Sequence, residues 1–344
     1  MLKHTREQGM RRSKALVVLS LCMMLGLLAC GENANEEPGP VLPSEPQYGE
    51  VIDLPGAFMA ADPTVIEVDG TWYIYPTTTT VSVECWSSTN FEAWDYEGVV
   101  WGPGEPGAWN DAKVWAPDVF QQEGLFYLYY TANMKIGVAV ADDPTGPFAD
   151  VYDHPLLGGG YGGVAFNTID AHMFRDADGA LYLYATGYMP LTFLRVFPMA
   201  DPVTVGGDWE FLFAANPLNW ELFVVEGPWL IVRDDLYYLM YSGHGGDRPQ
   251  YSIGYATATG PMGPFTRYEG NPILKADEAY EFWGPGHNSV TTGPDGDLWA
   301  FYHTKDCENV GWERHMRRNR LAFTDDGRLY VDLGLGPPSP LHLQ

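Results

Sequence analysis

The sequence predicts an all-β protein, a five-bladed β-propeller with four short antiparallel strands in each blade. Three observations support this prediction. Aromatic residues are abundant (12 Trp, 21 Tyr and 16 Phe), and so are the turn formers (39 Gly and 27 Pro). Long stretches of Ala, Glu, Lys and Leu, which favour helices, are missing. An acidic turn followed by an aromatic strand also recurs at a steady interval, which is typical of a radial β array.

The recurring unit is an acidic turn, usually with glycine, placed before a strand rich in aromatic residues. With the second turn residue as marker, the intervals between copies are 54, 55, 56 and 61 residues, which leaves room for four short strands each. The five copies are Asp69-Gly70 before TWYIYPT, Glu123-Gly124 before LFYLYYT, Asp178-Gly179 before ALYLYAT, Asp234-Asp235 before LYYLMYS, and Asp295-Gly296 before DLWAFYHT.

The outer part of a blade has a pattern of its own, a strand that runs into a Gly-Pro-aromatic turn. This pattern is clear in Ala139–Phe148 and Tyr255–Phe265, and it is looser in Ser87–Trp94. No shift in composition divides the chain beyond about residue 55. We therefore expect a single propeller domain over residues 51–344.

The first 29 residues have the features of a lipoprotein signal peptide. Five basic residues precede the apolar run Ala15–Leu28, which is too short for a comfortable membrane span. The letters LLACG at residues 27–31 resemble the bacterial lipobox, which implies cleavage before Cys30 and a lipid on its sulfur. An ordinary secretory signal with an incidental cysteine is the alternative. We expect an exported bacterial lipoprotein, anchored at the outer membrane or cell surface through this lipid alone.

Residues 30–50 are polar and contain four prolines, so we expect a disordered tether between the anchor and the domain. Two cysteines remain in the domain, Cys85 and Cys307. In an exported protein they could form a disulfide, and two free thiols are the other possibility.

The formal net charge of -26 argues against nucleic acid, or an anionic surface held by charge, as a partner. A neutral ligand or a bound cation fits this charge better. We expect the protein to be a monomer.

A polar residue stands near the start of the strand that precedes each repeated turn. The first strand of each propeller blade lines the central axis, so residues at equal depth on these strands converge. Counted back from the turn markers, four side chains lie 8 or 9 residues away, whereas Asp118 lies 6 away and is left out. The four are Asp62, Asp170, Glu226 and His287.

Converging carboxylates suit the hydrolysis of glycosidic bonds. One carboxylic acid must give a proton to the leaving oxygen while an ionised carboxylate activates a water on the opposite face. Like charges close together raise one pKa, which keeps one carboxyl group protonated near neutral pH. Glu226 stands between Val225 and Gly227-Pro228, where an unused carboxylate is costly. An Asp-Pro pair alone is an ordinary turn starter, so the shared depth is what favours a site.

Six short pieces, in order and at blade spacing, resemble glycoside hydrolase family 43 over nearly all of residues 54–333. The resemblance implies a five-bladed propeller with its active site on the central axis. Many members have Pro where this chain has Ala171. The pieces are DPTV at 62–65 with Trp72-Tyr73, WAPDV at 115–119, IDAHMF at 169–174, EGP at 226–228, GPGHNS at 284–289, and Arg314 with FTDDG at 323–327.

The resemblance also implies a role for each carboxylate. Asp62 matches the general base that activates water, and Glu226 matches the general acid. Asp170 matches the residue that tunes the pKa of the acid and holds the sugar. The implied mechanism is inversion by single displacement, for which the base and acid are roughly 6.5–9.5 Å apart.

Further positions are matched by the same resemblance. Trp115 matches an aromatic residue near the sugar pocket, and Arg314 matches an arginine that reaches the bound sugar, with Arg317 as its rival. His287 matches a histidine that lies beside an axial cation, largely through water. No cofactor is then required for the chemistry, and a structural Ca²⁺ on the axis is expected.

The favoured function is hydrolysis of pentose-containing plant cell-wall carbohydrates, of the α-L-arabinofuranosidase or β-xylosidase type. An endo- or exo-arabinanase, or a family member with another sugar specificity, is the first alternative. A non-catalytic carbohydrate-binding lipoprotein is a second, and it would tolerate Glu226→Gln. A purely structural propeller has no need for three carboxylates at one depth. A fructan hydrolase is disfavoured because Ala61 precedes Asp62-Pro63, where Asn is expected.

Overall fold

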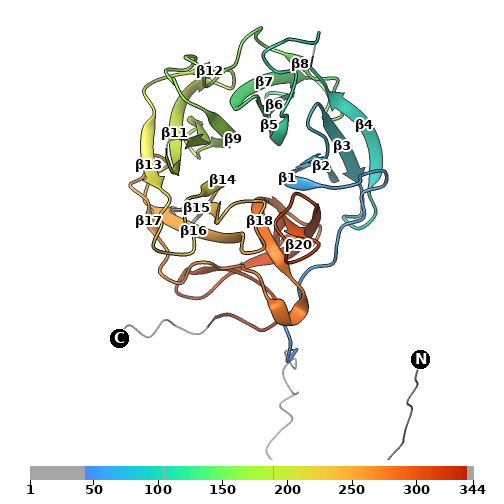
Figure 1. Cartoon of the computed structure of the whole chain (residues 1–344), viewed down its shortest axis with the longest axis vertical. Coiled ribbons are helices and arrows are strands. Elements are labelled where there is room, and N and C mark those ends of the chain that lie inside the picture. Colours follow the sequence, from blue (N-terminus) through green and yellow to red (C-terminus); the bar gives the residue numbers. More distant parts are fainter. Residues whose placement is uncertain (1–42, 104, 189, 339–344) are drawn as a thin grey trace, which may run out of the picture. The chain divides into compact units, whose positions relative to one another are not determined.

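The computed structural model describes residues 43–103, 105–188 and 190–338. Over these residues the chain forms five antiparallel sheets, each built from one continuous stretch of sequence and set radially around a central axis (Figure 1). The first strand of each sheet is the innermost, and the colours run once around the ring. The predicted five-bladed β-propeller is confirmed.

The strands follow the predicted order within each blade. Blade one holds β1 (Ala61–Val68), β2 (Thr71–Thr77), β3 (Val83–Ser88) and β4 (Asp95–Trp101), and blade two holds β5 (Trp115–Gln122), β6 (Leu125–Ala132), β7 (Lys135–Ala141) and β8 (Ala149–Asp150). Blade three holds β9 (Thr168–Arg175), β10 (Leu181–Tyr188), β11 (Thr192–Asp201), β12 (Thr204–Val205) and an additional strand, β13 (Glu210–Ala214).

Blade four holds β14 (Val225–Arg233), β15 (Leu236–Gly243), β16 (Ser252–Ala258) and β17 (Thr266–Arg267). A single 3-10 turn, η1 (Glu278–Tyr280), precedes blade five among the described residues. Blade five holds β18 (Trp283–Thr292), β19 (Leu298–Lys305), β20 (Arg314–Phe323) and β21 (Leu329–Val331).

The repeated acidic turns are the connections between first and second strands. In blades one, two and four the turn has two residues, both with positive φ, as in Asp69 (51°) and Gly70 (81°). Positive φ at both positions is the requirement of a type I′ hairpin, which glycine and acidic residues tolerate best. In blades three and five the connection is longer, because the strands pair from Arg175 to Leu181 and from Thr292 to Leu298.

Neighbouring blades are joined by apolar packing and by tyrosine hydroxyls. Five clusters of buried apolar side chains lie between adjacent blades, so the core is divided among the five interfaces. Buried tyrosines of second strands also donate hydrogen bonds to carbonyl groups in the next blade. The pairs are Tyr75 to Pro144 (2.6 Å), Tyr129 to Pro202 (2.5 Å), Tyr184 to Pro261 (2.5 Å) and Tyr238 to Gly327 (2.7 Å).

The segment before β1 packs on blade five. The Gln47 N–H donates to the carbonyl of Leu333 (2.8 Å), and the Tyr48 ring stacks on Phe282 with centroids 4.0 Å apart. The Gly49 N–H donates to Asn319 Oδ1 (2.9 Å). The expected tether over residues 30–50 therefore needs correction at its end, because residues 47–49 belong to the folded domain. The Tyr48 ring supplies apolar area that the prolines around it lack.

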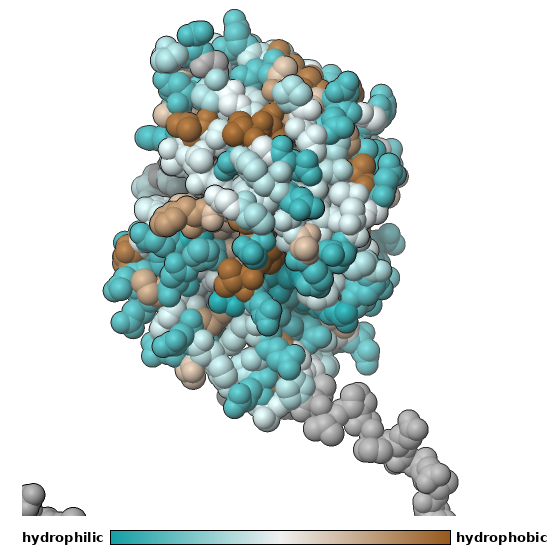
Figure 2. All heavy atoms as spheres, turned by 90° about the vertical axis from the view of Figure 1, so that its right-hand side faces the viewer, coloured by the Kyte–Doolittle hydropathy of each residue, from teal (hydrophilic) through white to brown (hydrophobic). Residues whose placement is uncertain are grey.

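The remaining expectations about the chain are resolved in part. Cys85 is buried and Cys307 is exposed, and both are free thiols. Of the two possibilities, a disulfide or two free thiols, the structure shows the second. Residues 1–29 and Cys30, the predicted lipidation residue, lie outside the described residues. Within the described ranges, no helix is long and apolar enough to cross a membrane. Figure 2 shows hydrophobic residues on one side of the molecule as scattered groups within a largely hydrophilic surface.

Candidate active site

Every first strand carries the same irregularity near the start of the strand. A β-bulge interrupts the pairing with the second strand, and one residue inside it has a positive φ. A bulge re-aims side chains, and left-handed backbone at residues other than glycine is typical of functional sites. The five residues are Asp62 (47°), Ala116 (43°), Asp170 (56°), Gly227 (58°) and His287 (50°).

Hydrogen bonds tie these bulges to the preceding blade. In four cases the backbone N–H of the positive-φ residue donates to a side chain near the end of the preceding blade's second strand. The pairs are Ala116 to Thr77 Oγ1 (2.8 Å), Asp170 to Thr131 Oγ1 (3.1 Å), His287 to Ser242 Oγ (2.7 Å) and Asp62 to His303 Nδ1 (3.2 Å). The fifth N–H, of Gly227, donates instead to Asp170 Oδ2 (3.1 Å), which ties that carboxyl group to the backbone beside Glu226.

The structure corrects the predicted depth of Glu226. Counting back from the turns placed it level with Asp170, but Gly227 occupies that position and Glu226 lies one residue earlier. The count failed because the turn of blade three is longer than that of blade four. Asp118 was correctly left out. It lies two residues beyond Ala116, buried, and accepts the N–H of Met173 (2.8 Å).

All six predicted site residues line one cavity of about 390 Å³. This volume falls within the range of small-ligand pockets. The predicted residues are Asp62, Trp115, Asp170, Glu226, His287 and Arg314. The cavity is completed by Met59, Thr77, Thr78, Thr79, Thr80, Ile169, Tyr188, Gly246 and Trp312. The rival arginine, Arg317, instead binds the carbonyl of Gly49 (2.5 Å) and Thr304 Oγ1 (3.0 Å).

Asp62 is surrounded by nitrogen atoms. Arg314 Nη1 donates to Asp62 Oδ1 (2.9 Å), and the Nδ1 atoms of His287 and His303 lie 3.4 Å and 3.2 Å from the same oxygen. Burial opposes ionisation of this carboxyl group, but Arg314 and the two histidines outweigh it and hold the pKa of Asp62 well below its usual range. Asp62 is therefore an ionised carboxylate at neutral pH.

The pKa values of Asp170 and Glu226 are shifted in the opposite direction, upward. Burial, followed by the nearby charges of Glu226 and Asp62, raises the pKa of Asp170 well above its usual range. Burial raises the pKa of Glu226 to about 7; the Asp62 charge adds to this increase, while Tyr251 and Arg314 oppose it. The two groups influence each other's titration, and both hold a proton to a higher pH than an ordinary carboxyl group does.

Two residues that the sequence reasoning missed support the carboxylates from behind. Tyr251 is fully buried, and its hydroxyl makes no hydrogen bond among the described residues, although its nearness to Glu226 lowers the pKa of that group. Its ring stacks on His303, the residue that contacts Asp62. His303 had a sequence signal. It stands where Thr77, the last residue of TWYIYPT, stands in blade one.

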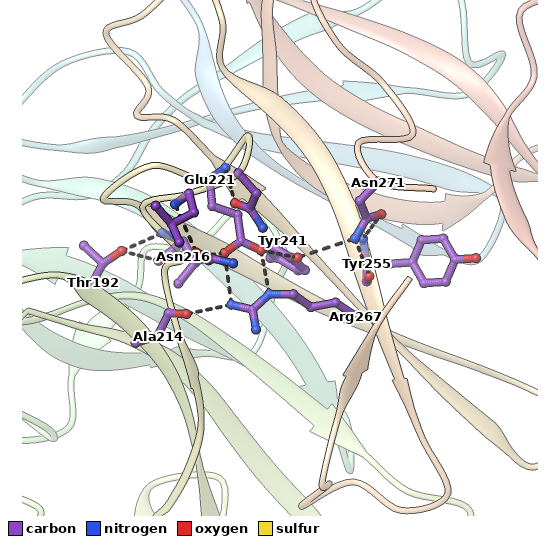
Figure 3. A network of polar contacts seen from close by, with 11 residues as sticks. Thr192, Ala214, Asn216, Glu221, Tyr241, Tyr255, Arg267 and Asn271 are labelled. Atoms are coloured by element: carbon purple, nitrogen blue, oxygen red, sulfur yellow. Dashed lines mark hydrogen bonds and ion pairs between the residues drawn. The ribbon is translucent and has the colours of Figure 1, made fainter. Parts of the chain in front are cut away.

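The loop before Glu226 is fastened by a buried carboxylate, Glu221, shown in Figure 3. Glu221 Oε1 accepts hydrogen bonds from the Tyr241 hydroxyl (2.7 Å) and from Arg267 Nε (2.6 Å). Glu221 Oε2 accepts from the Asn216 N–H (2.8 Å) and from Arg267 Nη2 (3.0 Å). The carboxylate thus joins the beginning of the loop to β15 and β17.

The residue next to Glu226 is fixed as well. The Val225 N–H donates to Thr192 Oγ1 (2.6 Å), and the Thr192 hydroxyl donates to the Val225 carbonyl (2.8 Å). Thr192 belongs to β11, so the start of β14 is held by the neighbouring blade. Glu226 is therefore presented from a rigid backbone.

The axial space behind the carboxylates is small. It is lined by Asp118, Asp170, His287 and Asn288, among others, and its volume of about 10 Å³ is close to that of one water molecule. Among the described residues, no group of three or more His, Cys, Asp or Glu side chains is placed to hold a metal ion. This donor set does not fit directly bound Ca²⁺, which takes about six to eight oxygen ligands. The expected axial Ca²⁺ stays a prediction.

Comparisons with known proteins agree with this fold. A thermostable family-43 glycoside hydrolase of known crystal structure superposes with a TM-score of 0.75, at 32% identity, over 86% of this chain and 98% of that one. A protein named beta-D-galactofuranosidase from Aspergillus niger is 29% identical over 78% of this chain and 81% of its own length. A protein named beta-xylosidase from Xylanibacter ruminicola is 27% identical over 80% of this chain and 97% of its own length.

The fold, the buried carboxylates and these relatives define the class of protein: it is a β-propeller glycosidase, an enzyme that hydrolyses O-glycosyl compounds. The model of the family described as Glycosyl hydrolases family 43 matches residues 56–329. The chain belongs to this family.

Proposed function

We propose that this enzyme hydrolyses α-L-arabinofuranosides or β-xylosides of plant cell-wall pentose glycans, by single displacement with inversion. The observation that supports the mechanism is an electrostatic asymmetry within one cavity. Asp62 is held ionised beside Arg314, whereas Glu226 has a pKa raised to about 7. A single displacement needs one ionised base and one protonated acid.

In this mechanism Asp62 accepts a proton from a water molecule that attacks the anomeric carbon. Glu226 donates its proton to the glycosidic oxygen as the carbon–oxygen bond breaks, so the leaving group departs as an alcohol. Asp170 titrates together with Glu226 and so tunes the acid, and it orients the sugar. Arg314 holds Asp62 in place and contacts the sugar, and Trp115 supplies an apolar face. No step uses a metal ion.

The substrate assignment follows the names of relatives. They include a beta-xylosidase, a xylosidase/arabinosidase from Bacteroides ovatus and an arabinoxylan arabinofuranohydrolase from Bacillus subtilis. The relative named beta-D-galactofuranosidase favours a second candidate, a hexofuranoside, and an extracellular arabinanase from Bacillus subtilis favours a third. All three candidates use the same acid and base.

The location of the enzyme is a further part of the proposal. The apolar run Ala15–Leu28 and the lipobox-like letters at 27–31 support export, with a lipid on Cys30 as the membrane anchor. Mass spectrometry of the protein from bacterial membranes tests this point. A mature chain that begins at a lipid-modified Cys30 is expected, and a chain that begins elsewhere would contradict it.

The catalytic assignment is tested with the variants Asp62→Asn and Glu226→Gln, assayed on aryl glycosides of α-L-arabinofuranose, β-D-xylose and β-D-galactofuranose and on arabinan. We expect each variant to lose at least about a thousandfold in kcat, because single displacement needs both groups. Asp234→Asn, at an exposed turn, is the matched control. Proton NMR of the first product resolves the anomer. A retained configuration contradicts inversion, and near-normal turnover by either variant contradicts the assigned roles.

A further inference from the structure

One large aromatic side chain at the cavity, that of Trp312, is mostly exposed to solvent. Trp312 lines the cavity, yet 59% of its surface is exposed. It lies in the connection between β19 and β20, which is as long as the connection between β15 and β16 and longer than those of the other three blades. A single exposed apolar residue is common on protein surfaces, but this tryptophan also borders the cavity, where its aromatic face can contact a ligand.

The backbone around Trp312 is firmly held. The Gly311 N–H donates to the Asp247 carbonyl (2.9 Å), and the Lys305 ammonium group donates to the Gly311 carbonyl. On the other side, the Arg314 guanidinium lies over the Trp312 ring, 5.2 Å from its centroid. Because Arg314 is itself bonded to Asp62, the ring is fixed relative to the carboxylates. A fixed ring binds a ligand with little loss of conformational entropy.

Trp312 lies on the side of the cavity where Glu226 is found. A Cβ added to Gly246 would stand 3.6 Å from Arg314 Nη1, 3.7 Å from Glu226 Oε1 and 3.7 Å from Trp312 Cζ3, so the three side chains reach the same point. Asp62 and Asp170, by contrast, are 7% and 5% exposed and lie at the bottom of the cavity. A sugar attacked beside Asp62 therefore lies deep in the cavity. The leaving group attached to this sugar then extends past Glu226 and contacts Trp312 at the cavity entrance.

We infer that Trp312 is the platform on which the leaving group of the substrate stacks, and that this leaving group is a sugar residue. The apolar face of a sugar ring matches the exposed face of an indole, and the glycosidic oxygen then lies within reach of Glu226. The inference rests on the proposed function and adds a specificity-determining residue to it. It predicts an enzyme that prefers oligosaccharides to substrates with a small leaving group.

The test compares two pairs of substrates that differ only in the leaving group: xylobiose with β-D-xylosyl fluoride, and an α-1,5-linked arabinobiose with α-L-arabinofuranosyl fluoride. For Trp312→Ala we expect kcat/KM to fall about tenfold or more on the disaccharide and to change less than about twofold on the matching fluoride. Trp312→Phe should recover part of the loss. Phe211→Ala removes an exposed aromatic residue of β13 and serves as the control.

Equal losses on the disaccharide and the fluoride would place Trp312 at the attacked sugar and overturn the inference, as would an unchanged kcat/KM on the disaccharide. If the wild-type enzyme cleaves none of the four substrates, the proposed function fails and the inference fails with it. If it cleaves them and only the selective loss is missing, the inference alone fails.

Discussion

The ring of Tyr251 lies flat against the imidazole of His303, with centroids 5.4 Å apart and an angle of 16° between the planes. His303 contacts the proposed base, Asp62, and the Tyr251 hydroxyl interacts with the proposed acid, Glu226. The stacked rings of Tyr251 and His303 therefore connect the proposed base with the proposed acid.

Removal of the Tyr251 hydroxyl should make Glu226 a weaker acid. The hydroxyl favours the ionised form of Glu226, so its loss in Tyr251→Phe raises the pKa of the acid. We expect the alkaline limb of kcat/KM against pH to move upward, because Tyr251 lowers the pKa of Glu226 in the wild-type enzyme. The phenyl ring keeps the stack on His303. A lower kcat at every pH, with the limb unmoved, would point to a merely structural tyrosine.

The wild-type pH profile should fall on its alkaline side. Activity needs protonated Glu226, whose pKa is raised to about 7, so kcat/KM declines as the pH rises above about 7. The apparent pKa of this decline belongs to the coupled pair of Asp170 and Glu226. Asp62 has a lowered pKa and stays ionised between pH 5 and 6, so little loss is expected there. A rate that increases between pH 6 and pH 8 would contradict both assignments.

Gly286→Ala should destabilise the fold. A Cβ at Gly286 would lie 2.0 Å from two atoms of the Tyr251 ring, which is buried and stacked and cannot move aside. We expect a loss of about 1–3 kcal/mol in the free energy of unfolding, measured by urea denaturation. Gly102→Ala, where a Cβ would meet nothing within 4 Å, is the matched control. Similar effects of the two substitutions would show that Tyr251 is not tightly packed.

Glu221→Gln should be costly although it lies outside the cavity. The substitution removes the buried charge that pairs with the partly exposed Arg267 (2.6 Å), and the loss of such charge-assisted hydrogen bonds costs about 1–3 kcal/mol. We expect a matching drop in unfolding free energy by urea denaturation. Asp234→Asn breaks the exposed contact with Arg233 and should cost less than about 1 kcal/mol. An equally small change in both variants would argue that the loop before Glu226 is held by other contacts.

The fold was predictable because its evidence is local. Hairpins such as Asp69-Gly70 mark the end of each first strand, and the aromatic strand that follows needs no distant contact to be recognised. Four of the cavity residues could also be predicted from spacing, because first strands converge on the axis whatever their detail. Trp115 and Arg314 were predicted from the family resemblance alone, and Arg314 lies on the third strand of its blade. The exact depth of Glu226 did not, since it depends on the turn lengths of blades three and four.

Residues that lie in connections were beyond the reach of sequence patterns. Tyr251 and Trp312 follow no period, and each reaches the site only because blades four and five pack together. The division of charge between Asp62 and Glu226 is also a property of the assembled site. It arises from Arg314 and His303, which stand more than two hundred residues from Asp62 in the chain.

The bond between Asp62 and Arg314 joins the first blade to the last. A chain emerging from the ribosome makes the base long before it makes the arginine that keeps this base charged. The contact that holds Asp62 ionised therefore forms only when the ring closes, after blade five has been synthesised. A nascent chain or a fragment that lacks β20 carries Asp62, Asp170 and Glu226 without Arg314, so its proposed base is not yet paired.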